Sequence, residues 1–454
     1  MNPPVNRSLI ITRVFLVRLL VLILLFSLTA CGRKQPINQI FLMPAPDVYD
    51  TGAIDPFTDF DPITTIPYEG MLYATDRKPA EEGDEKNVYL NERGFLLRLG
   101  VGKIKLGDDS MTWEEAREIS LLKNRTDKYP MKITEVREVG ILAESYSNFI
   151  PPEVKGPELQ QPGKEFAAKI NEKLAKSKRK DIFIYVHGYK VVFENPLLVA
   201  TELWHFLGYD GVFIAYSWPS TPKTLAYFSD LETTTLSAYN LRLLLEYLAR
   251  DTDAENIHII GYSAGTRLVI NALNQLALIY RDEDKETFRK YLRIGHVILA
   301  GSDFDRQLFG AYIDDGILKV SKDFTIYLSE MDKALGMSKW VFKRDRLGQK
   351  WDESKMTESI AEWLWNTDEI TFIDVTDAEK STTGNGHAYF RQSPWVSSDI
   401  LSTLMYDLTA EQRTLQRTPE WPIWKFPPDY ITTLAERLAK ENPALAPLME
   451  KKTE

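Results

Sequence analysis

Residues 257–270 read IHIIGYSAGTRLVI, an apolar run followed by Gly-x-Ser-x-Gly and then by apolar residues at helical spacing. This order predicts a buried strand, a tight turn that carries Ser263, and a helix. A nucleophile elbow needs glycine two positions before and two positions after its serine, because neighbouring backbone passes close to the strained turn. Gly261 and Gly265 meet this need. A glycine-rich turn with a solvated serine is the alternative interpretation.

Short apolar runs recur on both sides of this stretch and alternate with amphipathic segments. Strands are expected at 70–77, 94–106, 181–189, 211–220, 256–265, 294–304, 323–332 and 369–377, and helices at 194–208, 237–251 and 265–282. Continuous apolar strands separated by amphipathic helices predict an α/β fold with a mostly parallel central sheet flanked by helices on both faces. Ser263 then lies at the carboxyl end of a strand, where such sheets place their chemistry.

A serine nucleophile needs a base, and the chain has five histidines. His258 and His296 lie within expected strands and His205 lies within an expected helix, positions that are typical of packed histidines. His187 ends a strand, whereas His387 lies in a glycine-containing loop after the last expected strand. In α/β-hydrolases the order along the chain is serine, acid, histidine, and only His387 fits the last place.

The acid is expected between Ser263 and His387, at the end of a strand. Asp332 is preferred because the acid of this fold usually follows a later strand, and Asp303 is the alternative. A carboxylate there would orient the imidazole and stabilise the imidazolium. Asp303 is also interpretable as the N-cap of the helix that follows it.

Two backbone amides are expected to stabilise the oxyanion. One belongs to Ala264, directly after the nucleophile, and the other to Tyr189 in the loop after YVHG (185–188). The positive end of the helix after Ser263 would favour the same negative charge. A simple strand-ending turn at His187 and Gly188 is the alternative for the second donor.

The N-terminus has the layout of a secretory signal. Arg7, Arg13 and Arg18 flank the apolar run at 19–28, and no acidic residue precedes Asp47. The run is too short to span a bilayer comfortably. We therefore expect a signal peptide over residues 1–30.

The signal ends in Leu28-Thr29-Ala30-Cys31, which resembles the lipobox of bacterial lipoproteins and contains the only cysteine of the chain. The resemblance implies cleavage before Cys31 and lipidation of its sulfur; an uncleaved anchor is the alternative. We expect the body to be tethered in the bacterial cell envelope, at the outer membrane and facing the periplasm, with the proline-containing segment 31–68 as a tether.

The remaining chain is divided into an expected hydrolase domain at 69–415 and a helical extension at 416–454. The tryptophan-rich stretch 334–368 is interpreted as a cap or insertion, a lipid-contacting surface, or the core of an added helix. The formal net charge is −10 with both signs mixed along the chain, so nucleic acid is not an expected partner. No phosphate-binding loop or metal-ligand spacing occurs, so we expect no cofactor and no metal.

Seven motifs occur in an order and spacing that resemble the bacterial α/β-hydrolase family catalogued as domain of unknown function 900. They are YATDR (73–77), VHGY (186–189), YSWPS (216–220), GYSAGTR (261–267), LAGSDFDRQLF (299–309), LSEMDKAL (328–335) and GHAYF (386–390). The resemblance covers residues 70–410 and implies a serine-hydrolase fold with Ser263, Asp332 and His387 at its triad positions. Tyr262 stands where members of the family often have histidine.

These residues together predict a membrane-anchored serine hydrolase that acts on an acyl ester or a lipid through an acyl-enzyme intermediate. Two alternatives remain open. One is a non-catalytic envelope scaffold that keeps the hydrolase fold, and the other is an acyltransferase that uses the same triad.

Overall fold

One mixed sheet forms the centre of the protein, in the order β1-β4-β3-β2-β6-β5-β7-β8-β9-β10-β12-β11. The computed structural model describes residues 39–52, 54–57, 70–147, 158–223, 226–352, 354 and 356–441. The strands are β1 (Gln39–Phe41), β2 (Met71–Pro79), β3 (Tyr89–Leu106), β4 (Pro130–Ile141), β5 (Asp181–Val186), β6 (Val212–Ser217), β7 (Asn256–Tyr262), β8 (Ile294–Ala300), β9 (Asp323–Leu328), β10 (Ile370–Asp374), β11 (Gln416–Thr418) and β12 (Trp421–Lys425). All pairs from β2 through β6 to β12 are parallel, and antiparallel pairs extend the sheet at both edges.

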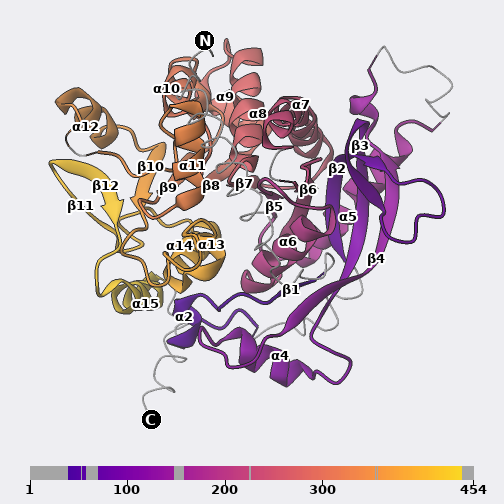
Figure 1. Ribbon diagram of the computed structural model, residues 1–454, viewed down its shortest axis with the longest axis horizontal. Helices are drawn as coiled ribbons and strands as arrows, with labels where there is room; N and C mark the ends of the chain where they lie inside the picture. The colour runs from indigo at the N-terminus through magenta and orange to yellow at the C-terminus, as the bar shows by residue number, and fades with distance from the viewer. Residues whose placement is uncertain are drawn as a thin grey trace, which may run out of the picture. The chain divides into compact units, whose positions relative to one another are not determined.

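Helices cover both faces of this sheet (Figure 1). Those described are α2 (Asp47–Asp50), α4 (Trp113–Ser120), α5 (Gln161–Lys176), α6 (Glu194–Phe206), α7 (Tyr227–Asp251), α8 (Gly265–Ile279), α9 (Lys285–Leu292), α10 (Arg306–Asp314), α11 (Lys333–Phe342), α12 (Glu358–Trp365), α13 (Tyr389–Gln392), α14 (Pro394–Tyr406) and α15 (Tyr430–Glu441). The predicted α/β fold, its mostly parallel sheet and its two helical layers are confirmed, as are all the expected strands.

Strand β5 shows why the sheet has a core on each face. Ile182, Ile184 and Val186 belong to the cluster that contains side chains of α5, α7 and α8. Phe183 and Tyr185, which alternate with them, belong to the cluster that contains side chains of α6, α14 and α15. Because successive side chains of a strand point to opposite faces, a strand buried on both faces is apolar throughout.

The segment expected as a tether packs in part against the body. β1 pairs with β4, and Val48, Tyr49 and Phe57 are buried in the cluster that also holds α6. The prediction of an extended tether over 31–68 is therefore wrong for the described residues 39–52 and 54–57. These apolar side chains follow no helical or strand period, so only the tertiary contacts reveal their burial.

The expected boundary at residue 416 also differs from the structure. β11 and β12 belong to the central sheet, with β12 parallel to β10, so the extension is not purely helical. Its helix α15 buries Tyr430, Leu434 and Leu438 and is docked. Residues 334–368 form α11 and α12 and the loop between them; Trp351 packs against Phe372, whereas Trp340 is 79% exposed.

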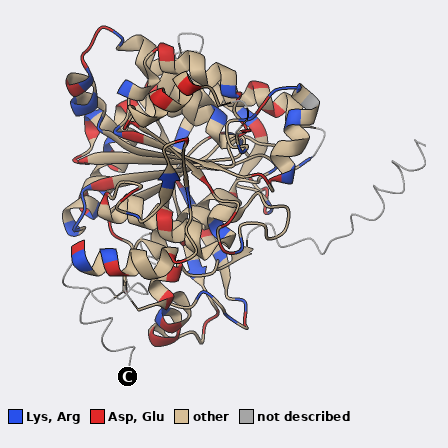
Figure 2. Cartoon of the chain, turned by 90° about the vertical axis from the view of Figure 1, so that its left-hand side faces the viewer, with Lys and Arg blue, Asp and Glu red and all other residues tan. Residues whose placement is uncertain are grey.

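Residues 1–38, with the expected signal peptide and Cys31, lie outside the described part of the chain. Within that part, no helix combines the length and the hydropathy that crossing a bilayer requires. Lys and Arg are interspersed with Asp and Glu over the helices and loops, and the strands between them carry few charges (Figure 2).

Candidate functional site

The turn after β7 holds Ser263 in a left-handed backbone conformation, with φ of 52°. This conformation is strained for a residue with a Cβ, and here it is held by a hydrogen bond from the Ser263 amide to the carbonyl of Ala300, 2.9 Å long. A Cβ at Gly265 would lie 2.3 Å from the carbonyl oxygen of His187, and one at Gly261 would lie 3.1 Å from a methyl of Val269. Both glycines therefore occupy positions where neighbouring atoms leave little or no room.

Three side chains from distant parts of the sequence meet at this turn. Nε2 of His387 lies 2.8 Å from Oγ of Ser263. Nδ1 of the same ring lies 2.6 Å from Oδ2 of Asp332. The ring is therefore placed to accept a proton from the serine while it donates its Nδ1–H to the carboxylate. The structure thus brings together Ser263, Asp332 and His387, which the sequence analysis selected.

The carboxylate of Asp332 is fixed from two sides. Its Oδ1 accepts a hydrogen bond of 3.0 Å from the amide of Leu335, as the N-cap of α11, while Oδ2 faces His387. Its side chain is fully buried. The N-terminus of a helix favours a negative charge, so the position suits an ionised carboxylate.

Two glycines that the sequence analysis did not select bring His387 to its place. A Cβ at Gly386 would lie 2.5 Å from the carbonyl oxygen of Met331, so the loop of His387 contacts the residue before Asp332 only because position 386 lacks a side chain. A Cβ at Gly301, after β8, would lie 2.9 Å from Cε1 of His387. Both residues have positive φ; Gly301 directly follows β8 and Gly386 directly precedes His387, and these glycines are the only signal in the sequence.

The backbone after β5 passes directly beside the serine. A Cβ at Gly188 would lie 2.8 Å from Cβ of Ser263. The amide of Tyr189 belongs to this loop, and Ala264 is the N-cap of α8, whose first amides have no acceptor within the helix. A loop and a helix N-terminus thus both lie next to Ser263, which is what an oxyanion site requires.

Asp303, the alternative acid, has a different role. Its carboxylate accepts a hydrogen bond of 2.6 Å from Ser338 and one of 3.2 Å from Arg267, and it lies 3.6 Å from Arg346. It also accepts a hydrogen bond from Tyr227. The alternative is therefore not supported, because two guanidinium groups and two hydroxyl groups hold this carboxylate.

Asp303 is not an N-cap either. That interpretation was wrong, since α10 is capped by Asp305, whose Oδ1 accepts from the amides of Gln307 and Leu308 at 2.9 and 3.0 Å. Two aspartates stand two positions apart at this helix start, and the tertiary ion pairs of Asp303 decide which one serves as the cap.

The other histidines are buried in structural contacts. His187 stacks on Trp218, and burial, with the nearby Arg77 charge, holds its pKa well below the usual range. Burial lowers the pKa of His205 to about 3. His258 and His296 stack on each other. All four therefore remain outside the contacts of Ser263.

Among the described residues, no cluster of three or more His, Cys, Asp or Glu side chains has the geometry of a metal site. Ser263, His387 and Asp332 have the contacts that a nucleophile, a base and an orienting acid require, and such an arrangement suits acyl transfer with the protein's own groups.

Residues 163–404 match the family described as alpha/beta hydrolase of unknown function (DUF900). No curated protein and no solved structure matches the chain significantly. The matched region contains Ser263, Asp332, His387 and the loop of Gly188. The chain belongs to this family of α/β-hydrolases.

Proposed function

We propose that this protein is a serine hydrolase of the esterase or lipase type, with Ser263 as nucleophile, His387 as base and Asp332 as orienting acid. The observation that supports this proposal is the unbroken series of contacts from Ser263 Oγ through His387 to the buried carboxylate of Asp332. A hydrolase fold that had become a scaffold would not require all three groups at hydrogen-bonding distance.

In the proposed reaction, Oγ of Ser263 attacks the acyl carbonyl while Nε2 of His387 takes the hydroxyl proton. The amides of Ala264 and Tyr189 donate hydrogen bonds to the oxyanion. His387 then protonates the leaving alcohol, which leaves an acyl group on Ser263. Water attacks this ester, again with His387 as base, and a carboxylate is released.

A row of aromatic rings begins at Tyr189, the residue after Gly188 in the loop that contacts Ser263, and favours an apolar acyl group. The ring of Tyr189 lies 5.0 Å from that of Tyr227, which lies 5.9 Å from Phe342. Phe228 continues the row, with its ring 5.8 Å from Phe342. Acyl chains are held mainly by apolar surface. An ester with a hydrocarbon acyl group therefore fits these aromatic rings better than an ester with a charged acyl group.

Membrane attachment through a lipid on Cys31 is part of the proposal and rests on the sequence. The described body begins at Gln39, and a chain of eight residues from Cys31 reaches at most roughly 28 Å. A lipidated Cys31 would thus keep the body near the bilayer. Cys31→Ser is expected to move the protein from the membrane fraction to the soluble fraction and to abolish incorporation of a clickable palmitate analogue; unchanged fractionation would contradict this part.

The hydrolase proposal is tested with p-nitrophenyl esters from acetate to dodecanoate. Wild type should turn them over, and Ser263→Ala should lose about 10³-fold or more in kcat/KM. Ser177→Ala is the matched control, since Ser177 follows α5 at the opposite end of β5 and should retain full activity. Supplying an alcohol acceptor distinguishes transfer, which yields a new ester, from hydrolysis, which yields the free acid.

A further inference from the structure

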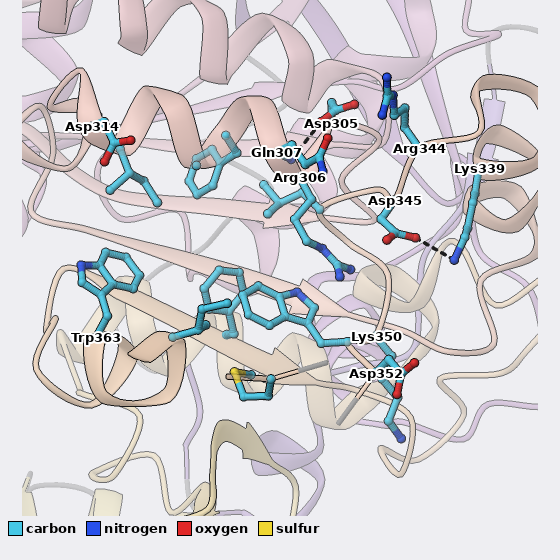
Figure 3. A pocket seen from close by; sticks show the side chains of 18 of the residues that line it. Asp305, Arg306, Gln307, Asp314, Lys339, Arg344, Asp345, Lys350, Asp352 and Trp363 are labelled. Atoms are coloured by element: carbon cyan, nitrogen blue, oxygen red, sulfur yellow. Dashed lines mark hydrogen bonds and ion pairs between the residues drawn. The ribbon is translucent and has the colours of Figure 1, made fainter. Parts of the chain in front are cut away.

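A pocket lies between α10, the loop 343–352, α12 and β10 (Figure 3). Its volume is about 650 Å³, which is within the range of small-molecule sites. None of Ser263, Asp332 and His387 lines it. Its apolar surface comes from Phe309, Ile313, Leu347, Trp351, Met356 and Phe372.

Arg306 provides a cation in this pocket that forms no ion pair with a described carboxylate, although the charge of the nearby Asp345 partly offsets its burial. Its Nη2 donates to the backbone carbonyls of Arg346 and Gln349 at 3.0 and 2.6 Å, and its Nε is buried with no hydrogen-bond acceptor among the described residues. Its guanidinium lies over the ring of Trp351, 5.0 Å from the centroid. Burial lowers the pKa of Arg306 to about 10, which leaves it charged at neutral pH. A guanidinium whose Nε is buried is normally paired, so this unsatisfied Nε indicates an anionic ligand.

The other labelled cations of the pocket lie at one end of it. Figure 3 shows Lys339, Arg344 and Lys350 on one side of Arg306, and Trp363 and Asp314 on the other. The acids on the cationic side are engaged. Asp345 forms an ion pair of 2.7 Å with Lys339. Asp305 caps α10 and Asp352 accepts from Ser354.

Two further cations at this end, Lys343 and Arg344, have no ion pair among the described residues. Lys350 is paired with Glu330 and Asp374. The cationic end is therefore complementary to an anionic group, while the apolar side chains of the pocket are complementary to a hydrocarbon chain.

Gly310 lies in the wall of the pocket. Arg306, Gly310 and Ile313 stand at helical spacing on one face of α10, and all three line the pocket. A Cβ at Gly310 would meet nothing within 4 Å. Glycine within a helix lowers its stability relative to alanine, so its presence here is not explained by the helix and is consistent with room for a ligand.

We propose that this pocket binds an amphipathic carboxylate, with the carboxylate against Arg306 and the hydrocarbon chain along Phe309, Ile313 and Trp351. The planar guanidinium matches a carboxylate, and the apolar wall matches an acyl chain. Binding here does not require Ser263 to react, so this proposal and the proposed hydrolase function fail in separate experiments.

The test uses the full chain and dodecanoate that carries a diazirine on its hydrocarbon chain. After irradiation, cross-links should map to peptides from α10 and residues 343–363, and labelling should saturate. Unlabelled dodecanoate should compete at least about tenfold better than dodecanol, because only the carboxylate interacts with the guanidinium. Labelling confined to peptides around Ser263, or equal competition by dodecanol, would overturn the proposal.

Two pairs of variants assign the site. Gly310→Trp should abolish labelling by filling the pocket, whereas Gly310→Ala should keep it. Arg306→Gln should weaken binding about tenfold and Arg306→Lys less, while Arg281→Gln, an exposed arginine at the end of α8, should have no effect. Circular dichroism establishes that each variant is folded. Unchanged labelling of folded Gly310→Trp contradicts the proposal irrespective of the arginine variants.

Discussion

Nε2 of His387 lies 2.8 Å from Oγ of Ser263, although 124 residues separate the two in the chain. The contact joins the turn after β7 to the loop after β10, and β8 and β9 lie between these two strands in the sheet. It depends on backbone that lacks side chains at Gly188, Gly301 and Gly386, each of which passes within contact of the serine, the histidine or the residue before Asp332. The loops around the sheet thus shape the site as much as its three polar groups do.

Asp332→Asn should mainly lower activity, whereas Asp303→Asn should mainly lower stability. Asparagine at 332 can still cap α11 but cannot stabilise an imidazolium, so kcat should fall about 10³- to 10⁴-fold with little loss of stability. Asparagine at 303 leaves Arg267 and Arg346 without their buried carboxylate and should lower the free energy of unfolding by about 3–5 kcal/mol.

Ester hydrolysis and urea unfolding of both variants make this comparison. Folded Asp303→Asn should keep kcat within a few-fold of wild type, because this carboxylate contacts neither Ser263 nor His387 in the structure. The assignment of the acid is wrong if Asp303→Asn loses more activity than Asp332→Asn.

Gly188→Ala should reduce activity more than stability. The added methyl group would approach Cβ of Ser263 to 2.8 Å, so the loop or the serine must shift by several tenths of an ångström. A displaced oxyanion amide typically lowers kcat by about 10²- to 10³-fold. Gly310→Ala is the matched control, because its methyl group meets open space. Equal kcat values for the two variants would show that the position of the Gly188 loop does not matter.

The site was predictable because each of its side chains follows an apolar strand. Ser263 stands in a strand-turn-helix pattern, and Asp332 and His387 follow later strands in the order that the fold requires. Asp303 satisfied the same criteria, and the sequence does not show that Arg267 and Arg346 hold it. The approach of Gly386 to Met331 is equally hidden, since a close contact between two loops leaves no periodic pattern.

The parts of the fold that were missed lie at the edges of the sheet. β4 has an irregular pattern of partly exposed residues, although it pairs with both β3 and β1. Residues 39–57 contain several prolines, which favoured a tether, yet Val48 and Tyr49 are completely buried. Short strands and irregular segments have too few residues for a period to be visible.

Tyr49→Ala tests the docking of this segment. Tyr49 is fully buried and donates a hydrogen bond to the carbonyl of Phe206. Its loss should lower the free energy of unfolding by about 3–5 kcal/mol, as for other large buried aromatic residues. Phe95→Ala, at a position 91% exposed, should change it by less than about 0.5 kcal/mol. Equal urea midpoints for the two variants would support the interpretation of this segment as a tether that does not pack against the body.

The buried His296 should make stability depend on pH. Burial lowers its pKa, but hydrogen bonds and charges from Asp323 and Asp407, at 2.9 and 3.0 Å, outweigh burial and raise it above 6.5. The contact with His296 in turn lowers the pKa of Asp407 below 3.8. His258 stacks on the ring and Lys322 pairs with Asp407 on the far side.

The raised pKa of His296 contributes stability that is complete below pH 6.5 and is lost as the pH rises through the folded-state pKa. The lowered pKa of Asp407 contributes stability that is complete above pH 3.8 and is lost as the pH falls through its folded-state pKa. The difference in unfolding free energy between wild type and His296→Asn should therefore be largest near pH 5–6 and should shrink towards pH 9. Urea unfolding across this range measures it, and a difference that is constant with pH would exclude a charged His296.

The most direct test of the central claim is labelling of the purified protein with a fluorophosphonate probe, which reacts with activated serines. We predict labelling of wild type at Ser263, its loss in Ser263→Ala and in His387→Ala, and its retention in Ser177→Ala. A folded wild-type protein that remains unlabelled would contradict an activated serine and would leave the contact of Ser263, His387 and Asp332 without a catalytic role.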